Sequence, residues 1–405
     1  MKRFIIDEDF IKFKHDEGNQ SDPTHVLSEL DFFNYELVPV SKLQFGKKYY
    51  FIYRVLGYPS HDLSQNLLPI PSSILKSIKN GYDIDIIFAT FHESDSRDSL
   101  KIIQNYCIAN KIDETKVHIF NGNSTLDELK KEYNVKLNVY SNNLIPRSMS
   151  RQMDLDGNHT LDTDRSFKFQ CFNRNFKNHR IAILAFLHYS NIIEETDWSS
   201  KYGSRLFDFY DHPSNKFWFF NKSDEHGDIL SDEWNEKLQS SFLYLAEQGD
   251  RKPATETFIF DQGGPQHDLS YKNNIFREAY INIVTETQYY WDNVTHITEK
   301  TLQPLWFYQL PIIVATPYHI KKTKELYDLD FFDDIIDHSY DLETNHQKRL
   351  EMIFSEIERL SKFDREYFRK FFEEKSTKKR LYENRNKIKL IQFSENDTNF
   401  FKQLK

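Results

Sequence analysis

The segment from residue 280 to 317 constrains the fold most, because it reads as strand, loop, helix and strand. Its first apolar run ends at Glu286, and Thr298 opens an amphipathic segment that leads to a second apolar run at 312–314. This alternation predicts two parallel strands joined by a crossover helix. Ligands of open parallel sheets bind at the carboxyl ends of the strands, so the segment also indicates where to expect a site.

Lys300 is the unusual residue of this segment. A cation in the first turn of a helix opposes the helix dipole, so helix propensity does not account for it. A bound diphosphate would, because the free N–H groups of a helix start favour an anion. Arg174 and Arg180 follow a second predicted strand in the same geometry. We predict that these three cations bind phosphate and that Glu299 binds ribose hydroxyls. Solvated charges at helix starts are the alternative.

Composition limits the class of protein. The 405 residues suffice for two domains, and the 16% aromatic content excludes a disordered chain. A net charge of −9 gives no global footprint for nucleic acid. Cys107 and Cys171 lack CxxC spacing, which excludes a disulfide framework and fits a reducing compartment. No apolar run is long enough for a signal peptide or a membrane span, so we expect a cytoplasmic protein.

The order of elements predicts an α/β protein. Strands are expected at 48–55, 83–91, 116–120, 136–140 and 167–172, with helices at 99–110, 126–133 and 180–189. Residues 146–166 lack hydrophobic periodicity and read as a surface turn. We therefore divide the chain into residues 1–150, a linker at 151–166, a second domain at 167–385 and a tail at 386–405. Two Rossmann-like domains facing a cleft form the GT-B architecture; an unrelated two-domain α/β enzyme is the alternative.

Several motifs resemble the donor-binding region of the α-1,3-fucosyltransferase family. INIVTET at 281–287 and ITEKTLQPLWFYQLPIIV at 297–314 match its E-N-S, [VI]-T-E-K and P-[IV]-[IV] pattern in order. FQCFNRNFKNHRIAILAFL at 169–187 resembles its strand–loop–Arg–helix element. The chain is more similar still to viral and phage glycosyltransferase-like proteins that also carry D-x-SYD and NHQKRL, here at 337–341 and 345–350. The resemblance covers roughly residues 165–360.

The resemblance implies a glycosyltransferase whose second domain holds a nucleotide sugar. Arg180 and Lys300 would contact the diphosphate and Glu299 the ribose, with Glu286 and Thr298 in the same region. The E-N-S triplet is here Glu286-Thr287-Gln288, so GDP-fucose is not assigned, although a GDP-sugar is slightly preferred. A viral origin would place the protein in the host cytoplasm. The aromatic runs at 217–220 and 288–293 fit either a stacking surface or the core.

The expected chemistry is metal-independent inversion at a hydroxyl acceptor, a glycan or a protein-linked glycan. Pairs such as Asp154/Asp156 occur about as often as chance predicts, so they indicate no metal site. Gln303-Pro304 stands where retaining enzymes of this architecture carry a second glutamate, which favours inversion. An inverting enzyme needs a carboxylate base. We choose Glu93, with Asp95 and His92 behind it, at the end of the strand at 83–91; an ordinary polar loop is the alternative.

Two other functions stay open. The same chemistry could act on modified bases of DNA, with the basic tail from Lys378 to Lys389 following phosphates. The net acidity disfavours this reading. A degenerate transferase fold could instead serve as a non-catalytic binding module. The joint presence of Arg180, Glu299 and Lys300 argues against that module, since an inactive site need not keep them. The sequence identifies neither the sugar, the acceptor nor the oligomeric state.

Overall fold

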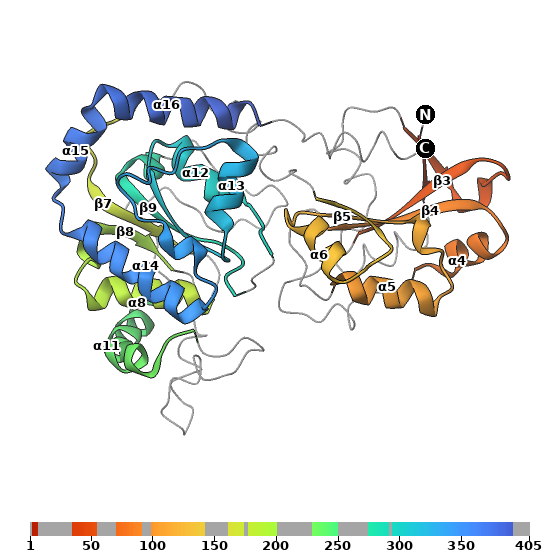
Figure 1. The fold of residues 1–405 in the computed structure, drawn as a ribbon, viewed down its shortest axis with the longest axis horizontal. Coiled ribbons are helices and arrows are strands. Elements are labelled where there is room, and N and C mark those ends of the chain that lie inside the picture. Colours follow the sequence, from red (N-terminus) through yellow and green to blue (C-terminus); the bar gives the residue numbers. More distant parts are fainter. Residues whose placement is uncertain are drawn as a thin grey trace. The chain divides into compact units, whose positions relative to one another are not determined.

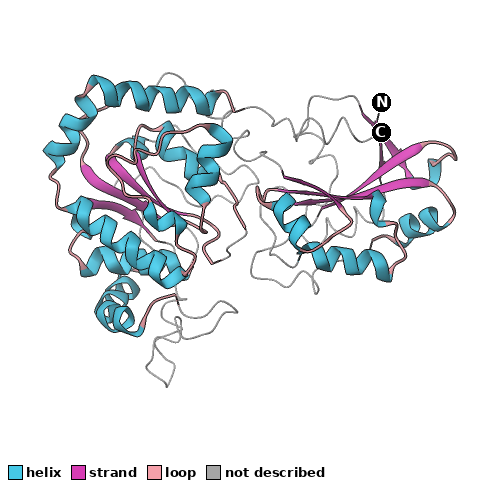
Figure 2. Cartoon of the chain, viewed as in Figure 1, coloured by secondary structure: helices cyan, strands magenta, loops and turns pink. Residues whose placement is uncertain are grey.

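The computed structural model describes residues 2–6, 35–54, 70–90, 99–141, 161–173, 177–200, 229–249, 274–290 and 294–391. The chain divides into two compact units, one built mainly from residues up to 145 and one mainly from residues 146–391. Each unit is α/β and contains its own sheet of parallel strands (Figures 1 and 2). The predicted fold class is therefore confirmed at this level. No helix in the described ranges is long and apolar enough to cross a membrane.

The first unit has a six-stranded parallel sheet in the order β2-β1-β3-β4-β5-β6. Its strands are β1 (Lys2–Ile6), β2 (Tyr35–Pro39), β3 (Lys48–Arg54), β4 (Asp83–Thr90), β5 (Val117–Asn121) and β6 (Asn138–Ser141). Its helices are α4 (Ser72–Lys79), α5 (Ser99–Ala109) and α6 (Leu126–Glu132). Strands β3 to β6 confirm the four strands expected in this part of the sequence. The sequence reading missed β1 and β2, which are short and only partly buried.

One face of this sheet packs on its helices, because alternate residues of β3, β4 and β5 are apolar. On the opposite face of the sheet, charged side chains lie near the starts of β3, β4 and β5. Asp85 Oδ1 accepts a hydrogen bond from Lys48 Nζ at 2.5 Å, and its Oδ2 lies 3.1 Å from His118 Nε2. Asp83 accepts from Lys116 Nζ at 2.8 Å. These partners explain why the sequence can place two aspartates in β4 without a metal.

The second unit has a four-stranded parallel sheet in the order β10-β9-β7-β8. Its strands are β7 (Phe167–Phe172), β8 (Thr196–Ser199), β9 (Ala279–Thr285) and β10 (Leu310–Val314). Its helices are α8 (Asn178–Tyr189), α11 (Asp232–Gln248), α12 (Glu299–Trp306), α13 (His319–Tyr327), α14 (His346–Ser361), α15 (Arg365–Glu373) and α16 (Lys375–Lys389). From β7 the chain continues to β8 at one edge of the sheet, and from β9 it continues to β10 at the other edge. The topological switch point therefore lies between β7 and β9.

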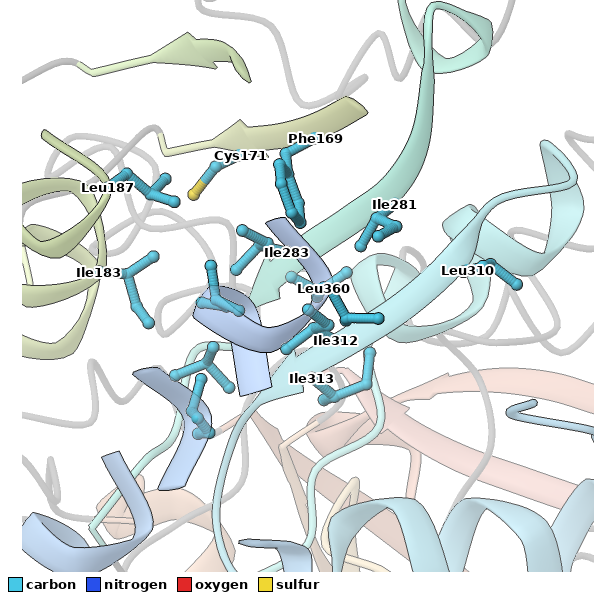
Figure 3. Packing of buried hydrophobic residues seen from close by; sticks show 14 of the residues in the cluster. Phe169, Cys171, Ile183, Leu187, Ile281, Ile283, Leu310, Ile312, Ile313 and Leu360 are labelled. Atoms are coloured by element: carbon cyan, nitrogen blue, oxygen red, sulfur yellow. The ribbon is translucent and has the colours of Figure 1, made fainter. Parts of the chain in front are cut away.

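The sheet of the second unit is buried on both faces, so β9 and β10 are apolar almost throughout. Figure 3 shows Phe169 and Cys171 of β7 beside Ile283 of β9, with Ile183 and Leu187 of α8 packed against them. Helices α8 and α14 cover this face, where Phe186 stacks on Phe354 at 4.2 Å. Helices α12, α15 and α16 belong to the other face. This two-sided cover is what a doubly wound sheet requires.

The segment at 338–341 covers the outer edge of β10, the last strand of the sheet. Tyr340 Oη accepts a hydrogen bond from Ile313 N at 3.1 Å, and His338 Nε2 lies 3.1 Å from the carbonyl oxygen of Pro311. An edge strand otherwise exposes its N–H and C=O groups to other chains. The D-x-SYD motif thus has a structural role at this edge.

The expectation of a surface turn at 146–166 is wrong at Arg165, which is only 1% exposed. Its guanidinium group donates to the carbonyl oxygens of Ala279 at 2.5 Å and Tyr308 at 2.9 Å, and lies 4.9 Å from the ring centre of Phe372. Hydrophobic periodicity could not reveal this residue, because its partners are backbone groups far away in the sequence. The predicted tail also begins later than expected, since α16 continues to Lys389.

We expect Arg165→Ala to destabilise the second unit by about 3 kcal/mol, because it leaves buried carbonyl groups without donors. Urea unfolding followed by tryptophan fluorescence measures the change. Arg369→Ala is the matched control, since Arg369 pairs with Glu366 and Glu373 on the surface of α15 and should unfold as the wild type does. Equal midpoints for the two variants would contradict the role of Arg165.

Candidate functional site

The switch point of the second sheet brings two helix starts together. Strand β7 ends before Asn173 and leads to α8, and β9 ends at Thr285 and leads to α12. Thr285 Oγ1 donates to Asn173 Oδ1 at 2.5 Å and so joins the two strand ends. Open α/β sheets bind ligands at this position. Arg174 lies in the loop at 174–176, outside the described residues.

Glu286 is the centre of this arrangement. It is 1% exposed, and both of its carboxylate oxygens accept hydrogen bonds from the start of α12. Thr298 Oγ1 donates to them at 2.8–2.9 Å and Thr301 Oγ1 at 2.5 Å. The backbone N–H of Thr287 adds a fourth contact at 3.1 Å. The two threonines of the TEKT sequence therefore fix α12 to the end of β9.

Glu286 is ionised although it is buried. Burial alone would raise the pKa of this carboxyl group, but the charges of Lys300 and His319 and the hydroxyl groups of Thr301 and Thr298 lower it to about 2. Burial lowers the pKa of His319, so its ring is neutral at pH 7. Its Nε2 lies 2.8 Å from Thr301 Oγ1, whose hydroxyl group donates a hydrogen bond to Glu286. At neutral pH, Lys300 therefore supplies the compensating charge.

Lys300 lies at the helix start, as the sequence predicts. Thr298 caps α12 by accepting from Lys300 N at 3.2 Å. Lys300 Nζ lies 3.1 Å from Glu299 Oε1, and the Lys300 side chain remains 35% exposed. The Glu299 side chain is 23% exposed. Burial opposes ionisation of Glu299, but the charge of Lys300 keeps its pKa below the ordinary value. A cation and a carboxylate are thus both accessible at one helix start.

The first turn of α8 faces the end of β9. Lys177 Nζ donates to the carbonyl oxygen of Thr287 at 2.6 Å, and His179 Nε2 lies 2.9 Å from that of Glu286. Arg180 Nη2 donates to the carbonyl oxygens of Thr285 and Glu286 at 3.2 and 3.3 Å. Arg180, 4% exposed, holds the strand end in place and brings a positive charge to it.

Tyr289 shows how the loop after β9 is held. Its ring stacks on His179 at 5.1 Å and on the guanidinium group of Arg349 at 4.5 Å. Arg349 Nη2 also donates to the carbonyl oxygen of Tyr289 at 2.5 Å. Tyr289 is 1% exposed, so in this aromatic run the core interpretation is right for Tyr289. Sequence reasoning missed the role of Arg349, although the NHQKRL motif contains it.

Positive charge exceeds negative charge around the end of β9. Among the described residues, the cations bonded to residues 285–289 and 298–299 are Lys177, Arg180, Lys300 and Arg349. Glu286 and Glu299 are the carboxylates of the same group. Four cations facing two carboxylates leave a surplus of positive charge beside two helix starts. Such a place binds anions, and a diphosphate matches the charge.

The remaining predicted site residues are the candidate base and its neighbours. His92, Glu93 and Asp95 follow β4 within 91–98, outside the described residues. The described ranges contain no group of three His, Cys, Asp or Glu side chains placed to hold a metal ion.

Two basic residues of α16, Arg380 and Lys387, form ion pairs within the unit. Arg380 pairs with Asp330 at 2.6 Å and Asp334 at 2.7 Å, and Lys387 pairs with Asp328 at 2.7 Å. The carboxylates of these partners offset part of the positive charge on which phosphate binding by this tail would depend.

No protein-family model matches the sequence, and no curated protein and no solved structure matches it either.

The low pKa of Glu286 predicts that the free energy of unfolding falls at acidic pH. A pKa of about 2 in the folded chain, against an ordinary value of 4.5, contributes stability that is complete above pH 4.5 and is lost as the pH falls toward 2. Glu286→Gln should cost about 3 kcal/mol at pH 7 and clearly less at pH 3. Urea unfolding at both values measures it.

Glu358→Gln is the control, because Glu358 forms a surface ion pair with Lys362 at 3.4 Å and should matter little at either pH. If Glu286→Gln costs the same free energy at pH 7 and pH 3, the buried anion is not the source of its effect.

Proposed function

We propose that the chain is a glycosyltransferase that takes a nucleotide sugar as donor and transfers the sugar to a hydroxyl acceptor, a glycan or protein-linked glycan. The surplus of positive charge at the switch point of the second sheet carries the proposal. A leaving nucleoside diphosphate gains negative charge as the glycosidic bond breaks, and fixed cations and helix starts stabilise that charge. We further propose the GT-B architecture and a cytoplasmic location, which is the host cytoplasm if the chain is viral.

Each residue of the cluster has a part in this proposal. Lys300, accessible at the start of α12, binds the diphosphate, and Arg180 adds charge from the start of α8. The half-buried carboxylate of Glu299 accepts hydrogen bonds from ribose hydroxyls. Glu286 and Thr298 act through Lys300, since their hydrogen bonds fix the helix start that presents it. These roles need no metal ion, because the cations supply the charge that a metal would otherwise supply.

The acceptor reacts by inversion in this proposal. Its hydroxyl oxygen forms the new bond to the anomeric carbon while the bond from that carbon to the diphosphate breaks. The hydroxyl proton passes to a carboxylate base, for which Glu93 is the candidate and Asp95 and His92 its supports. A GDP-sugar is the preferred donor. A glycan acceptor is favoured over DNA, because basic side chains of α16 are paired with Asp328, Asp330 and Asp334.

A thermal-shift screen with GDP, UDP, ADP and CDP tests the proposal. A ligand at 100 times its Kd stabilises a protein by about 2.7 kcal/mol, which raises the Tm by several degrees. We expect at least one nucleotide to do so. If none of the four stabilises the wild type, a non-catalytic binding module becomes the better assignment.

Lys300→Ala tests the clamp directly. It should keep the fold but lower the Tm of the free protein, because Glu286 loses its countercharge. It should also remove the nucleotide-induced shift from that Tm and lower transfer by about 10²–10³-fold, because it removes a cation from the leaving group. Lys362→Ala is the matched control, since Lys362 is exposed at the end of α14. A Lys300→Ala protein that binds every nucleotide as the wild type does would refute the assignment of Lys300.

A further inference from the structure

Tyr318 stands at the carboxyl end of the sheet in an unusual backbone conformation. It immediately precedes α13 with φ 62° and ψ 11°, which is the left-handed region. Residues before a helix normally adopt extended backbone and are Ser, Thr, Asp, Asn or Gly. A bulky aromatic residue in the left-handed region costs about 1–3 kcal/mol, and such strain clusters at functional sites.

Asp341 holds Tyr318 in this conformation. The backbone N–H of Tyr318 donates to the carbonyl oxygen of Asp341 at 2.6 Å. The Asp341 carboxylate accepts from Ile320 N at 2.9 Å and Lys321 N at 3.0 Å, and so caps α13 in place of a side chain at position 318. Asp341 is itself fixed, because the neighbouring Tyr340 bonds to β10. The D-x-SYD motif therefore holds both the backbone N–H of Tyr318 and the first turn of the helix that follows it.

The ring of Tyr318 remains accessible. The residue is 39% exposed, and the Lys321 ammonium group lies 5.8 Å from the ring centre. In the aromatic run at 288–293, Tyr289 is buried between His179 and Arg349. Tyr318 thus presents an open aromatic face at the edge of the sheet where ligands bind.

The start of α13 lies next to the first turn of α12. His319 Nε2 is 2.8 Å from Thr301 Oγ1, so the residue after Tyr318 contacts the residue after Lys300. This contact places Tyr318 one residue from a side chain that touches the first turn of α12, the turn that carries Lys300. An aromatic face at this position can stack on any base, since every base has a π-face.

We propose that Tyr318 is the stacking surface for the base of the bound nucleotide. The proposal rests on the function proposed above and adds the contact that holds the nucleoside. Its ring supplies contact area, and a tyrosine has only two side-chain torsions to fix, so little side-chain freedom is lost on binding.

The test compares Tyr318→Gly and Tyr318→Asn with Tyr318→Phe, using calorimetry with the best nucleoside diphosphate and with inorganic pyrophosphate. Gly and Asn accept the left-handed backbone, so both variants should melt within a few degrees of the wild type. Both should bind the nucleoside diphosphate about tenfold or more weakly, in the range of base–aromatic stacking. Their affinity for pyrophosphate should not change. Tyr318→Phe should bind both ligands as the wild type does.

Each other outcome decides against the proposal. Unchanged nucleotide affinity in the Gly and Asn variants overturns the stacking role while leaving the proposed function intact. An equal loss for pyrophosphate shows that residue 318 positions the helix starts and does not touch the base. A wild-type protein that binds neither ligand overturns the proposed function as well, which separates the two failures.

Discussion

The buried carboxylate of Glu286 is the interaction on which the site depends. An ionised carboxylate away from water is costly unless hydrogen bonds and a countercharge compensate it. Thr298 and Thr301 provide the hydrogen bonds because they are three positions apart and face the same side of the helix start. Lys300 lies between them in the sequence and provides the charge. Strand β9 and helix α12 are therefore joined by one buried anion, and the orientation of Lys300 follows from it.

Three buried arginines of this unit bond to backbone carbonyl groups. Arg165 donates to carbonyl oxygens where β9 begins, and Arg180 donates to carbonyl oxygens where β9 ends. Arg349 donates to the carbonyl oxygen of Tyr289 in the loop that follows. Strand ends and loops leave such groups without partners, and an arginine satisfies several of them at once. Because the carbonyl groups carry no net charge, the positive charge at the end of β9 stays available to an anion.

The sequence predicted those elements that a pattern of neighbouring residues marks. Apolar runs such as those at 281–284 and 312–314 become strands, and the cation at position 300 marks a helix start. The sequence did not predict contacts between distant segments. The stacking of Tyr289 between His179 and Arg349 joins three segments that are more than 50 residues apart. The burial of Arg165 likewise depends on carbonyl groups that carry no signature in the sequence. Glu286 was predicted in the site, but the hydrogen bonds that it accepts from Thr298 and Thr301 were not.

Two neighbouring helix starts in this sheet are each fixed by a carboxylate of the protein. Glu286 binds the threonines of α12, and Asp341 caps α13. Both carboxylates accept hydrogen bonds from hydroxyl or backbone N–H groups and are thereby held in place. His319 connects the two helix starts through Thr301 and is neutral, so it adds no charge. The positive charge of this edge therefore comes from Lys300 and the α8 cations, whereas the carboxylates supply its rigidity.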